Sequence, residues 1–214
     1  MKFLATFVLT ILLGACAALR GTPEPYTVYA PRLAPIAGNG APVQWQLVVQ
    51  TPLASDALDS KRIVVMPTPG VLQVYPNARW RDPAPALLQS LLIQAFEDSG
   101  RIVGVATTGS GLNADYALAL ELRAFGTEYV DGAPHAVVRL TAKLVDYGSN
   151  RMLAAKAFAA DVPSAGATAA DAAAGIEQAL NRVLPQIVEW TMTQGNSAWI
   201  RRAPAAGPAL APAK

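Results

Sequence analysis

The chain has 214 residues, 52% of them hydrophobic, and its 17 Lys and Arg against 15 Asp and Glu give a formal net charge of +2. This near-neutral balance, with arginines scattered along the chain, gives no basic patch for a nucleic acid, and the high apolar content excludes a disordered chain. The length fits one folded domain with a sizeable core.

The N-terminus has the form of a secretory signal peptide. A charged start and a short apolar run lead to Leu13-Gly14-Ala15 and then Cys16, the single cysteine of the chain. The run is too short for a bilayer span, which needs roughly 20 apolar residues. Leu-Gly-Ala-Cys resembles the lipobox of bacterial lipoproteins, in which the chain is cut before a lipidated cysteine. The alternative is a signal peptide without lipidation, in which the cysteine occurs by chance.

The first part of the mature chain contains short apolar segments bounded by Pro and Gly. The Pro/Gly-rich stretch 30–42 is predicted to be a loop, and Pro67 and Pro69 are expected to end the third apolar segment. Four strands are predicted here, at Tyr26–Tyr29, Trp45–Val49, Arg62–Met66 and Val71–Tyr75.

A first helix is predicted to begin at Pro83, with Asp82 as its N-terminal cap. Leucines recur at helical spacing after Pro83, and Gly100 is expected to end the helix because glycine readily adopts a left-handed conformation. The segment Arg101–Val105 is predicted to be a strand. This helix should pack one face against a sheet.

Two later segments alternate apolar and polar residues with the period of a strand that has one buried face. They cover residues 116–123 and 138–144, and Asp131-Gly132 between them is typical of a hairpin turn. We therefore expect an antiparallel hairpin, followed by a third strand over Met152–Asp161.

The last helix is predicted to begin near Thr168, where Asp171 three residues later approximates a capping box. An apolar stripe continues to about Gly195, and residues beyond it are rich in Ala and Pro. The predicted organisation is a signal peptide over 1–15, a lipidated tether over 16–25, one α+β domain over 26–195 and a disordered tail over 196–214. The fold class is α+β, with a mainly antiparallel sheet and two helices packed on one face.

The sequence contains few residues that could carry out catalysis or bind a cofactor. His135 is the single histidine of the chain and lies near the predicted turn, and no Gly-x-Ser-x-Gly elbow occurs. One histidine and one lipidated cysteine do not make a metal site, and no phosphate-binding loop is present. We therefore expect no enzyme activity, no metal and no cofactor besides the covalent lipid on Cys16; a lipid-anchored hydrolase is the weakest alternative.

Aromatic residues mark candidate contact positions. Tyr75, Arg79 and Trp80 join the end of a predicted strand to the start of the first helix. Either Trp80 packs beneath that helix as a structural residue, or the motif touches a partner directly. Trp45, Trp80 and Trp199 are the candidate anchors for such a partner.

Taken in order, these motifs resemble a known family. The lipobox cysteine, Tyr26–Tyr29, the strand Arg62–Met66 with Pro67, and the Arg79-Trp80-x-Asp82-Pro83 helix opening resemble the auxiliary lipoproteins of bacterial ABC-type lipid transport systems. These accompany proteins with the mammalian-cell-entry (MCE) domain, including the paraquat-inducible system. The resemblance covers about residues 26–194.

The resemblance implies a non-enzymatic lipoprotein anchored in the outer membrane and facing the periplasm, an assignment that Ala17 after the cysteine also favours. Its implied partners are an MCE-domain protein and further copies of itself. The alternative is a lipoprotein that supports the assembly of an outer-membrane β-barrel or plugs it; the genes beside this one would separate the two.

Overall fold

The computed structural model describes residues 25–36, 38 and 40–202. The predicted lipobox Leu13-Gly14-Ala15, the lipidation site Cys16 and the part of the predicted tail from 203 to 214 lie outside the described residues. Among the described residues, no helix combines the length and the hydrophobicity that a membrane crossing requires.

The described chain forms one large sheet and two helices. The strands β6, β7 and β8 are long and lie side by side, while β1, β2 and β5 have three residues each. The elements are β1 Thr27–Tyr29, β2 Leu47–Val49, β3 Arg62–Thr68, β4 Val71–Trp80, α2 Ala84–Asp98, β5 Val105–Thr107, β6 Tyr116–Val130, β7 Ala133–Asp146, β8 Met152–Pro163 and α3 Ala169–Arg202.

β6 is the strand that joins the two parts of the sheet. One edge of β6 pairs with β7 along its whole length, and β7 pairs in turn with β8. The other edge is shared: β2 pairs with the first residues of β6, and β3 pairs with residues 126–128. β4 and then β1 extend the sheet beyond β3, and β5 extends it beyond β2.

The expectation of a mainly antiparallel sheet is wrong, because the sheet is mixed and four of its seven strand pairings are parallel. The predicted hairpin of β6 and β7 is confirmed, with Asp131 and Gly132 both at positive φ in its turn. A hairpin is visible in a sequence because its strands are neighbours. Parallel pairs such as β2 with β6 join segments far apart in the chain, so no local turn signal announces them.

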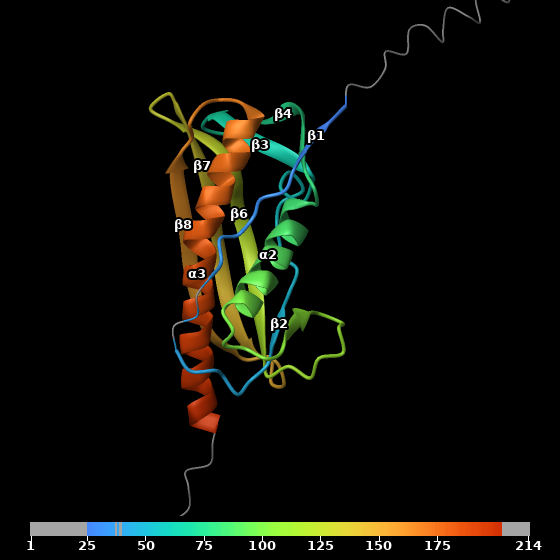
Figure 1. Cartoon of the computed structure of the whole chain (residues 1–214), viewed down its shortest axis with the longest axis vertical. Coiled ribbons are helices and arrows are strands. Elements are labelled where there is room, and N and C mark those ends of the chain that lie inside the picture. Colours follow the sequence, from blue (N-terminus) through green and yellow to red (C-terminus); the bar gives the residue numbers. More distant parts are fainter. Residues whose placement is uncertain (1–24, 37, 39, 203–214) are drawn as a thin grey trace, which may run out of the picture.

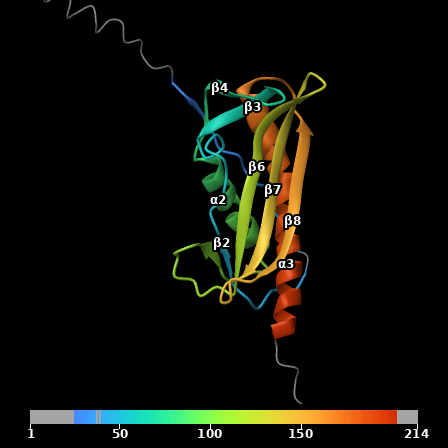
Figure 2. The same cartoon turned by 180° about the vertical axis from the view of Figure 1, so that it is seen from behind.

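Both helices lie on the same face of the sheet, as predicted, and leave the other face uncovered (Figures 1 and 2). α3 contacts β7 and β8, whereas α2 contacts β2 and β5 and also touches α3. One hydrophobic core forms between the helices and the sheet. Its members on β6 and β7 alternate with residues of the opposite face, as the period-two pattern predicts.

Of the three predicted helix-end signals, the capping box of α3 and Gly100 after α2 are confirmed, and the Asp82 cap is not. Thr168 and Asp171 form the capping box: the backbone N–H of Thr168 donates to the Asp171 carboxylate (3.1 Å), and the N–H of Asp171 donates to Thr168 Oγ1 (3.2 Å). Gly100, at φ +63°, follows the last turn of α2. Asp82 does not cap α2, because its carboxylate binds the Arg81 guanidinium (2.9 Å) and Pro83 occupies the N-cap position.

Several predicted boundaries move, and Pro67 does not end β3, which runs to Thr68. α3 continues to Arg202, so the predicted disordered tail is wrong for residues 196–202, where Ala198 is buried. β4 continues to Trp80, and the strand expected over 101–105 instead covers 105–107. In each case packing against a distant element decides the boundary, since the local sequence there is rich in small residues or proline.

The segment between β1 and β2 runs along α3 and is fixed by hydrogen bonds from side chains of that helix. The Arg32 N–H donates to Glu177 Oε2 (2.8 Å), and the Ala34 N–H donates to Asn181 Oδ1 (2.7 Å). Asn181 also donates from Nδ2 to the Arg32 carbonyl (3.1 Å). Arg32 and Ala34 of the predicted loop are therefore fixed against α3, on the path that leads from β1 towards β2 (Figure 1).

Candidate functional site

Trp80 belongs to the core. It is the last residue of β4 and is 0% exposed, and its indole packs edge-on against Phe125 of β6, with ring centroids 5.4 Å apart. Its backbone N–H donates to the Lys61 carbonyl (2.7 Å). A partner cannot reach this indole in the folded protein, so the structural interpretation of Trp80 is the one that the geometry supports.

Arg79 and Tyr75 lie beside Trp80 but differ in their surroundings. Arg79 is exposed, and its guanidinium stacks over the ring of Tyr26 at 5.1 Å. Tyr75 is half-buried, and its hydroxyl donates to Thr127 Oγ1 (3.3 Å). Burial raises the pKa of the Tyr75 phenol above its ordinary value. Of the three residues in the predicted motif, Arg79 is the one that a partner can contact freely.

The other two tryptophans named as candidate anchors also serve the core. Trp45 is 1% exposed, its Nε1–H donates to Asn196 Oδ1 (2.9 Å), and its ring packs against Tyr116. Gly195 of α3 lies directly over this indole, where a Cβ atom would come within 2.4 Å of it. Trp199 is partly buried against the same core. The prediction of tryptophan anchors on the surface is therefore wrong for Trp45 and Trp80.

Exposed apolar side chains gather instead at the two ends of the long axis. Eleven large apolar side chains are exposed among the described residues, and ten of them fall into two groups according to the elements that carry or flank them. We call the first group the β1 end: Tyr26, Val28, Val71, Leu72, Val74 and Val130. We call the second the Arg202 end: Val103, Tyr147, Met152 and Ile200.

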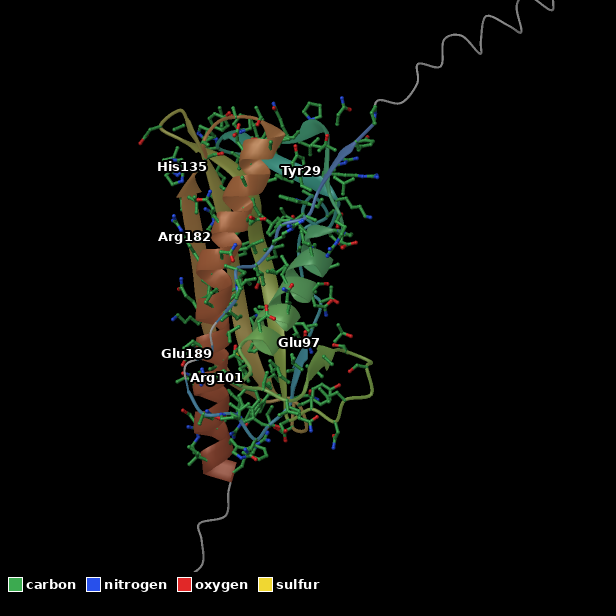
Figure 3. All side chains as sticks on the ribbon, viewed as in Figure 1. Tyr29, Glu97, Arg101, His135, Arg182 and Glu189 are labelled. Carbon is green, nitrogen blue, oxygen red and sulfur yellow. The ribbon has the colours of Figure 1, made fainter. Side chains whose placement is uncertain are left out.

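The β1 end is built by strand pairing. Val28 of β1 lies opposite Arg79 of β4, and Val71 lies opposite Thr68 across the β3–β4 hairpin. The end of β3 runs beside the end of β6, where Val130 precedes the β6–β7 turn. Tyr29, which is labelled at this end in Figure 3, follows Val28 and packs against the core. These pairings place Val28 beside one end of β4, and Val71, Leu72 and Val74 on the β3–β4 hairpin at its other end, next to the end of β6.

The Arg202 end is held together by charges between α3 and the β6–β7 part of the sheet. The Arg202 guanidinium binds the Asp146 carboxylate, lies 3.7 Å from Asp115, and stacks over the Tyr116 ring at 4.7 Å. A backbone hydrogen bond from Ser149 and the bond from Arg202 lower the pKa of Asp146 to about 2. Higher on the same helix, Glu189 pairs with Arg101 (2.6 Å), which fixes the segment before β5 to α3 (Figure 3).

A small hollow lies between β3, β4 and β6. Its volume is about 80 Å³, and its lining is mainly apolar, with Leu58, Val64, Met66 and Leu72 among its residues. Gly126 also lines it, and a Cβ atom there would lie 2.4 Å from the Val64 carbonyl oxygen. Small-molecule pockets in proteins hold about 300–1,000 Å³. The hollow therefore suits one apolar side chain better than a whole lipid.

His135 lies at the start of β7, near the β6–β7 turn, as predicted. Its Nδ1 lies 2.6 Å from Asp161 Oδ1 on β8. The structure places no serine or threonine hydroxyl in hydrogen-bond contact with this ring within the residues it describes, and those residues contain no cluster of His, Cys, Asp and Glu that could hold a metal ion. The contact between His135 and Asp161 therefore links two partly exposed side chains on the neighbouring strands β7 and β8.

Sequence patterns alone did not identify the residues at the two ends. Ile200 falls in the part expected to be a tail, and Val103 in a segment expected to be a strand. A signal existed in Val71-Leu72-Gln73-Val74, whose three apolar residues do not keep a strict period of two. Such a run places apolar side chains on both faces of the strand, and in this structure they remain exposed.

Comparison with known proteins identifies related sequences and folds. The sequence model of the family described as ABC-type transport auxiliary lipoprotein component matches residues 26–188. Protein XCC0632 from Xanthomonas campestris, known from its crystal structure, is 39% identical, with a TM-score of 0.77 over 81% of this chain and 99% of that one. A crystal structure of an uncharacterized protein, 17% identical, has a TM-score of 0.57 over 83% of this chain and 99% of that one, which shows likeness of fold alone.

A curated relative matches part of the chain. The uncharacterized protein bll6063 of Bradyrhizobium diazoefficiens is 25% identical over 146 residues, which are 68% of this chain. The match spans 39% of the length of that relative.

Proposed function

We propose, from the premise that the chain belongs to the family of ABC-type transport auxiliary lipoprotein components, that it is an outer-membrane lipoprotein that docks the MCE-domain protein of a lipid transport system. Its acyl chains are attached to Cys16, and its folded body faces the periplasm. Its work is binding and not catalysis. The family match over residues 26–188, which is nearly the whole described body, is the observation that carries this proposal.

The position of the Arg202 end supports a docking role for that end. The described chain begins at Pro25, beside β1, and the end of α3 lies at the opposite end of the long axis (Figure 1). A body tethered through its N-terminus presents its far end to a partner that approaches from the periplasm. Val103 is 97% exposed and Ile200 is 72% exposed there, which makes them available as apolar anchors.

The interactions around these anchors support the same role. Arg202 binds Asp146 and Asp115, and the Ser149 N–H donates to Asp146 Oδ1 (2.9 Å). These contacts fix the end of α3 against the β7–β8 turn, which carries Tyr147. A preordered apolar surface with a charged rim loses little conformational entropy when it binds.

Binding is tested by co-purification from detergent-solubilised membranes. The full chain should retain an MCE-domain protein of the same transport system. The double variant Val103→Asp, Ile200→Asp should weaken this capture at least about tenfold, because hot-spot residues each contribute more than about 1 kcal/mol. Leu53→Asp is the matched control: Leu53 is 75% exposed but lies outside both ends, so capture should be unchanged.

The outcomes separate the two candidate functions. Failure of the unaltered chain to capture any MCE-domain protein would remove the transport role. Recovery of an outer-membrane β-barrel protein in its place would favour the assembly role. Capture that survives the double variant would leave the transport role intact and would show that the Arg202 end is not the docking surface.

We propose in addition that the protein associates with itself through the free edge of β8. This strand has 12 residues and pairs on one side only, with β7. Long unpaired edges offer backbone N–H and C=O groups to another strand unless they are covered. Light scattering of the full chain in detergent should give a mass that is a multiple of the protomer, and a strict monomer would contradict self-association.

A further inference from the structure

The exposed side chains of the β1 end are typical of a surface that another molecule covers in the functional protein. It carries six of the eleven exposed large apolar side chains of the described residues, on strands that pair with one another. Leu72 is 46% exposed on β4, near the β3–β4 turn, and Val28 is 49% exposed on β1, opposite Arg79 near the other end of β4. Large apolar side chains exposed on strands of one sheet region mark a candidate site of contact with a protein or a membrane.

Basic side chains accompany the apolar ones on the β1 side. Lys61, Arg62 and Arg79 are exposed, and none of the three has a carboxylate partner among the described residues. Arg62 and Arg79 lie opposite each other on β3 and β4. Two like charges side by side are unfavourable for folding, so the pair indicates an anionic partner that neutralises both.

Acidic groups also lie near these basic residues: Asp82 is paired with Arg81, and Asp56 and Asp59 are exposed in the loop before Lys61. Glu128 is paired with Arg139, and Asp131 lies in the β6–β7 turn. Asp161 is on β8, at the opposite edge of the sheet from β1. The ion pairs of Asp82 and Glu128 with other arginines therefore leave Lys61, Arg62 and Arg79 without a carboxylate partner among the described residues.

The length of chain before the described residues fixes what the β1 end can reach. Cys16 precedes Pro25 by nine positions, and an extended chain spans at most about 3.6 Å per residue. A lipid on Cys16 therefore holds Pro25 within about 30 Å of the bilayer surface. Tyr26 and Val28 follow directly, so the tether keeps the β1 end at a high effective concentration near lipid.

We propose that the β1 end rests on the anionic phospholipid surface that holds the anchor. The apolar side chains enter the boundary between headgroups and acyl chains, while Lys61, Arg62 and Arg79 bind lipid phosphates. This inference depends on the lipid anchor of the proposed function. It assigns to the β1 end a second attachment that fixes the orientation of the body, with the Arg202 end pointing away from the membrane.

A second copy of the chain fits this surface less well. In a two-fold contact the same patch faces itself, which would bring Arg62 and Arg79 of one copy against those of the other. Like charges across an interface are unfavourable. An anionic lipid surface supplies the opposite charge and an apolar layer together, and polybasic segments bind such surfaces.

Depth measurements on the lipidated full chain test the proposal. Because the Cys16 thiol carries the lipid, Leu72→Cys introduces the one free thiol, which is labelled with an environment-sensitive fluorophore after reconstitution into vesicles of phosphatidylglycerol and phosphatidylcholine. Val103→Cys, at the Arg202 end, and Leu53→Cys, outside both ends, are the matched controls. The label at position 72 should be quenched by nitroxide lipids and protected from aqueous iodide, and the labels at the two control positions should show the reverse.

Charge variants give a second measurement on the same vesicles. In the Leu72→Cys background, Arg62→Gln and Arg79→Gln should each lower the ratio of docked to free bodies about fivefold, the effect of one basic residue at an anionic surface. Neither substitution should change quenching on pure phosphatidylcholine vesicles. If each substitution lowered docking equally on anionic and on pure phosphatidylcholine vesicles, the result would contradict a role for these arginines in binding lipid phosphate.

Three further results would each overturn the proposal, and they distinguish the surface contact from the lipid anchor. A chain that floats with the vesicles but whose position-72 label stays open to iodide would overturn the docked surface and leave the anchor intact. A label shielded from both quenchers would show that protein covers the β1 end, which also overturns the proposal. A chain that does not float with vesicles would remove the lipid anchor, and with it both the proposed function and this inference.

Discussion

The strands β6, β7 and β8 pair over most of their length beneath α3, with one register shift in each pairing, whereas β1 pairs with β4 over three residues and the shorter β3–β4 pairing has two register shifts. In the first region the apolar side chains of one face are buried almost completely. In the second, Leu72 and Val74 remain partly exposed on a strand of ten residues. In this protein the helix-covered face of the long strands is buried, while β4 keeps apolar side chains exposed that could contact another molecule.

Substitution of Trp80 should have the largest effect, because this residue joins the two regions through its contact with Phe125. Trp80→Ala should destabilise the protein by about 3–5 kcal/mol, the usual loss for a large aromatic removed from a core. Urea unfolding followed by circular dichroism measures it. Trp80→Phe, which keeps a ring in the site, should cost clearly less; a Trp80→Ala protein that unfolds like the unaltered chain would contradict the buried role.

Gly126 is where the backbone of β3 comes closest to β6. Gly126→Ala places a Cβ 2.4 Å from the Val64 carbonyl oxygen, so the two strands must separate. We expect a loss of about 1–3 kcal/mol, typical of overpacking. Gly148→Ala is the control, since a Cβ in that turn lies 3.8 Å from its nearest neighbour, Asp146. Equal stability of the two variants would show that the regions are joined more loosely than the structure indicates.

Asp146, the last residue of β7, makes a pH-dependent contribution to the stability of the folded protein. Its folded pKa, about 2, lies below the ordinary 3.8, so the stabilisation is complete above pH 3.8 and is lost as the pH falls towards 2. Asp146→Asn should cost about 1 kcal/mol near neutral pH, since solvent screens a pair at the surface. The difference from the unaltered chain should shrink as the pH falls towards 2.

The control for this prediction is Asp56→Asn, which alters an exposed carboxylate in the loop before β3. Its difference from the unaltered chain should be small near neutral pH, because an exposed surface substitution usually changes stability by less than about 0.5 kcal/mol. A difference for Asp146→Asn that does not shrink as the pH falls would show that the Arg202 and Ser149 contacts do not hold the Asp146 carboxylate in its charged form.

Arg79→Ala should have the smallest effect on folding, although Arg79 is the direct neighbour of Trp80. An exposed cation over an aromatic ring contributes about 0.5–1 kcal/mol, so the loss should not exceed that range. The same urea unfolding measures it. A loss of several kcal/mol would mean that Arg79 belongs to the folded framework and not to the exposed surface of the β1 end.

Local sequence patterns located the elements whose partners are near in the chain. Alternation around Asp131-Gly132 predicted the β6–β7 hairpin, Thr168 and Asp171 predicted the start of α3, and Gly100 predicted the end of α2. Each depends on contacts within a few residues, such as a turn or a cap, so the amino acids themselves carry the information.

Tertiary structure decided the features whose partners are distant. The parallel pairing of Leu47 with Tyr116, and of Val64 with Gly126, depends on surfaces that meet after folding, and a three-residue strand has too short a pattern to announce it. The same holds for Trp80: the sequence left open whether it packs beneath the helix or contacts a partner, and its contact with Phe125 places it in the core. Tertiary structure also decides which apolar side chains are exposed at the β1 end and the Arg202 end, because a side chain stays exposed only when no other element packs over it.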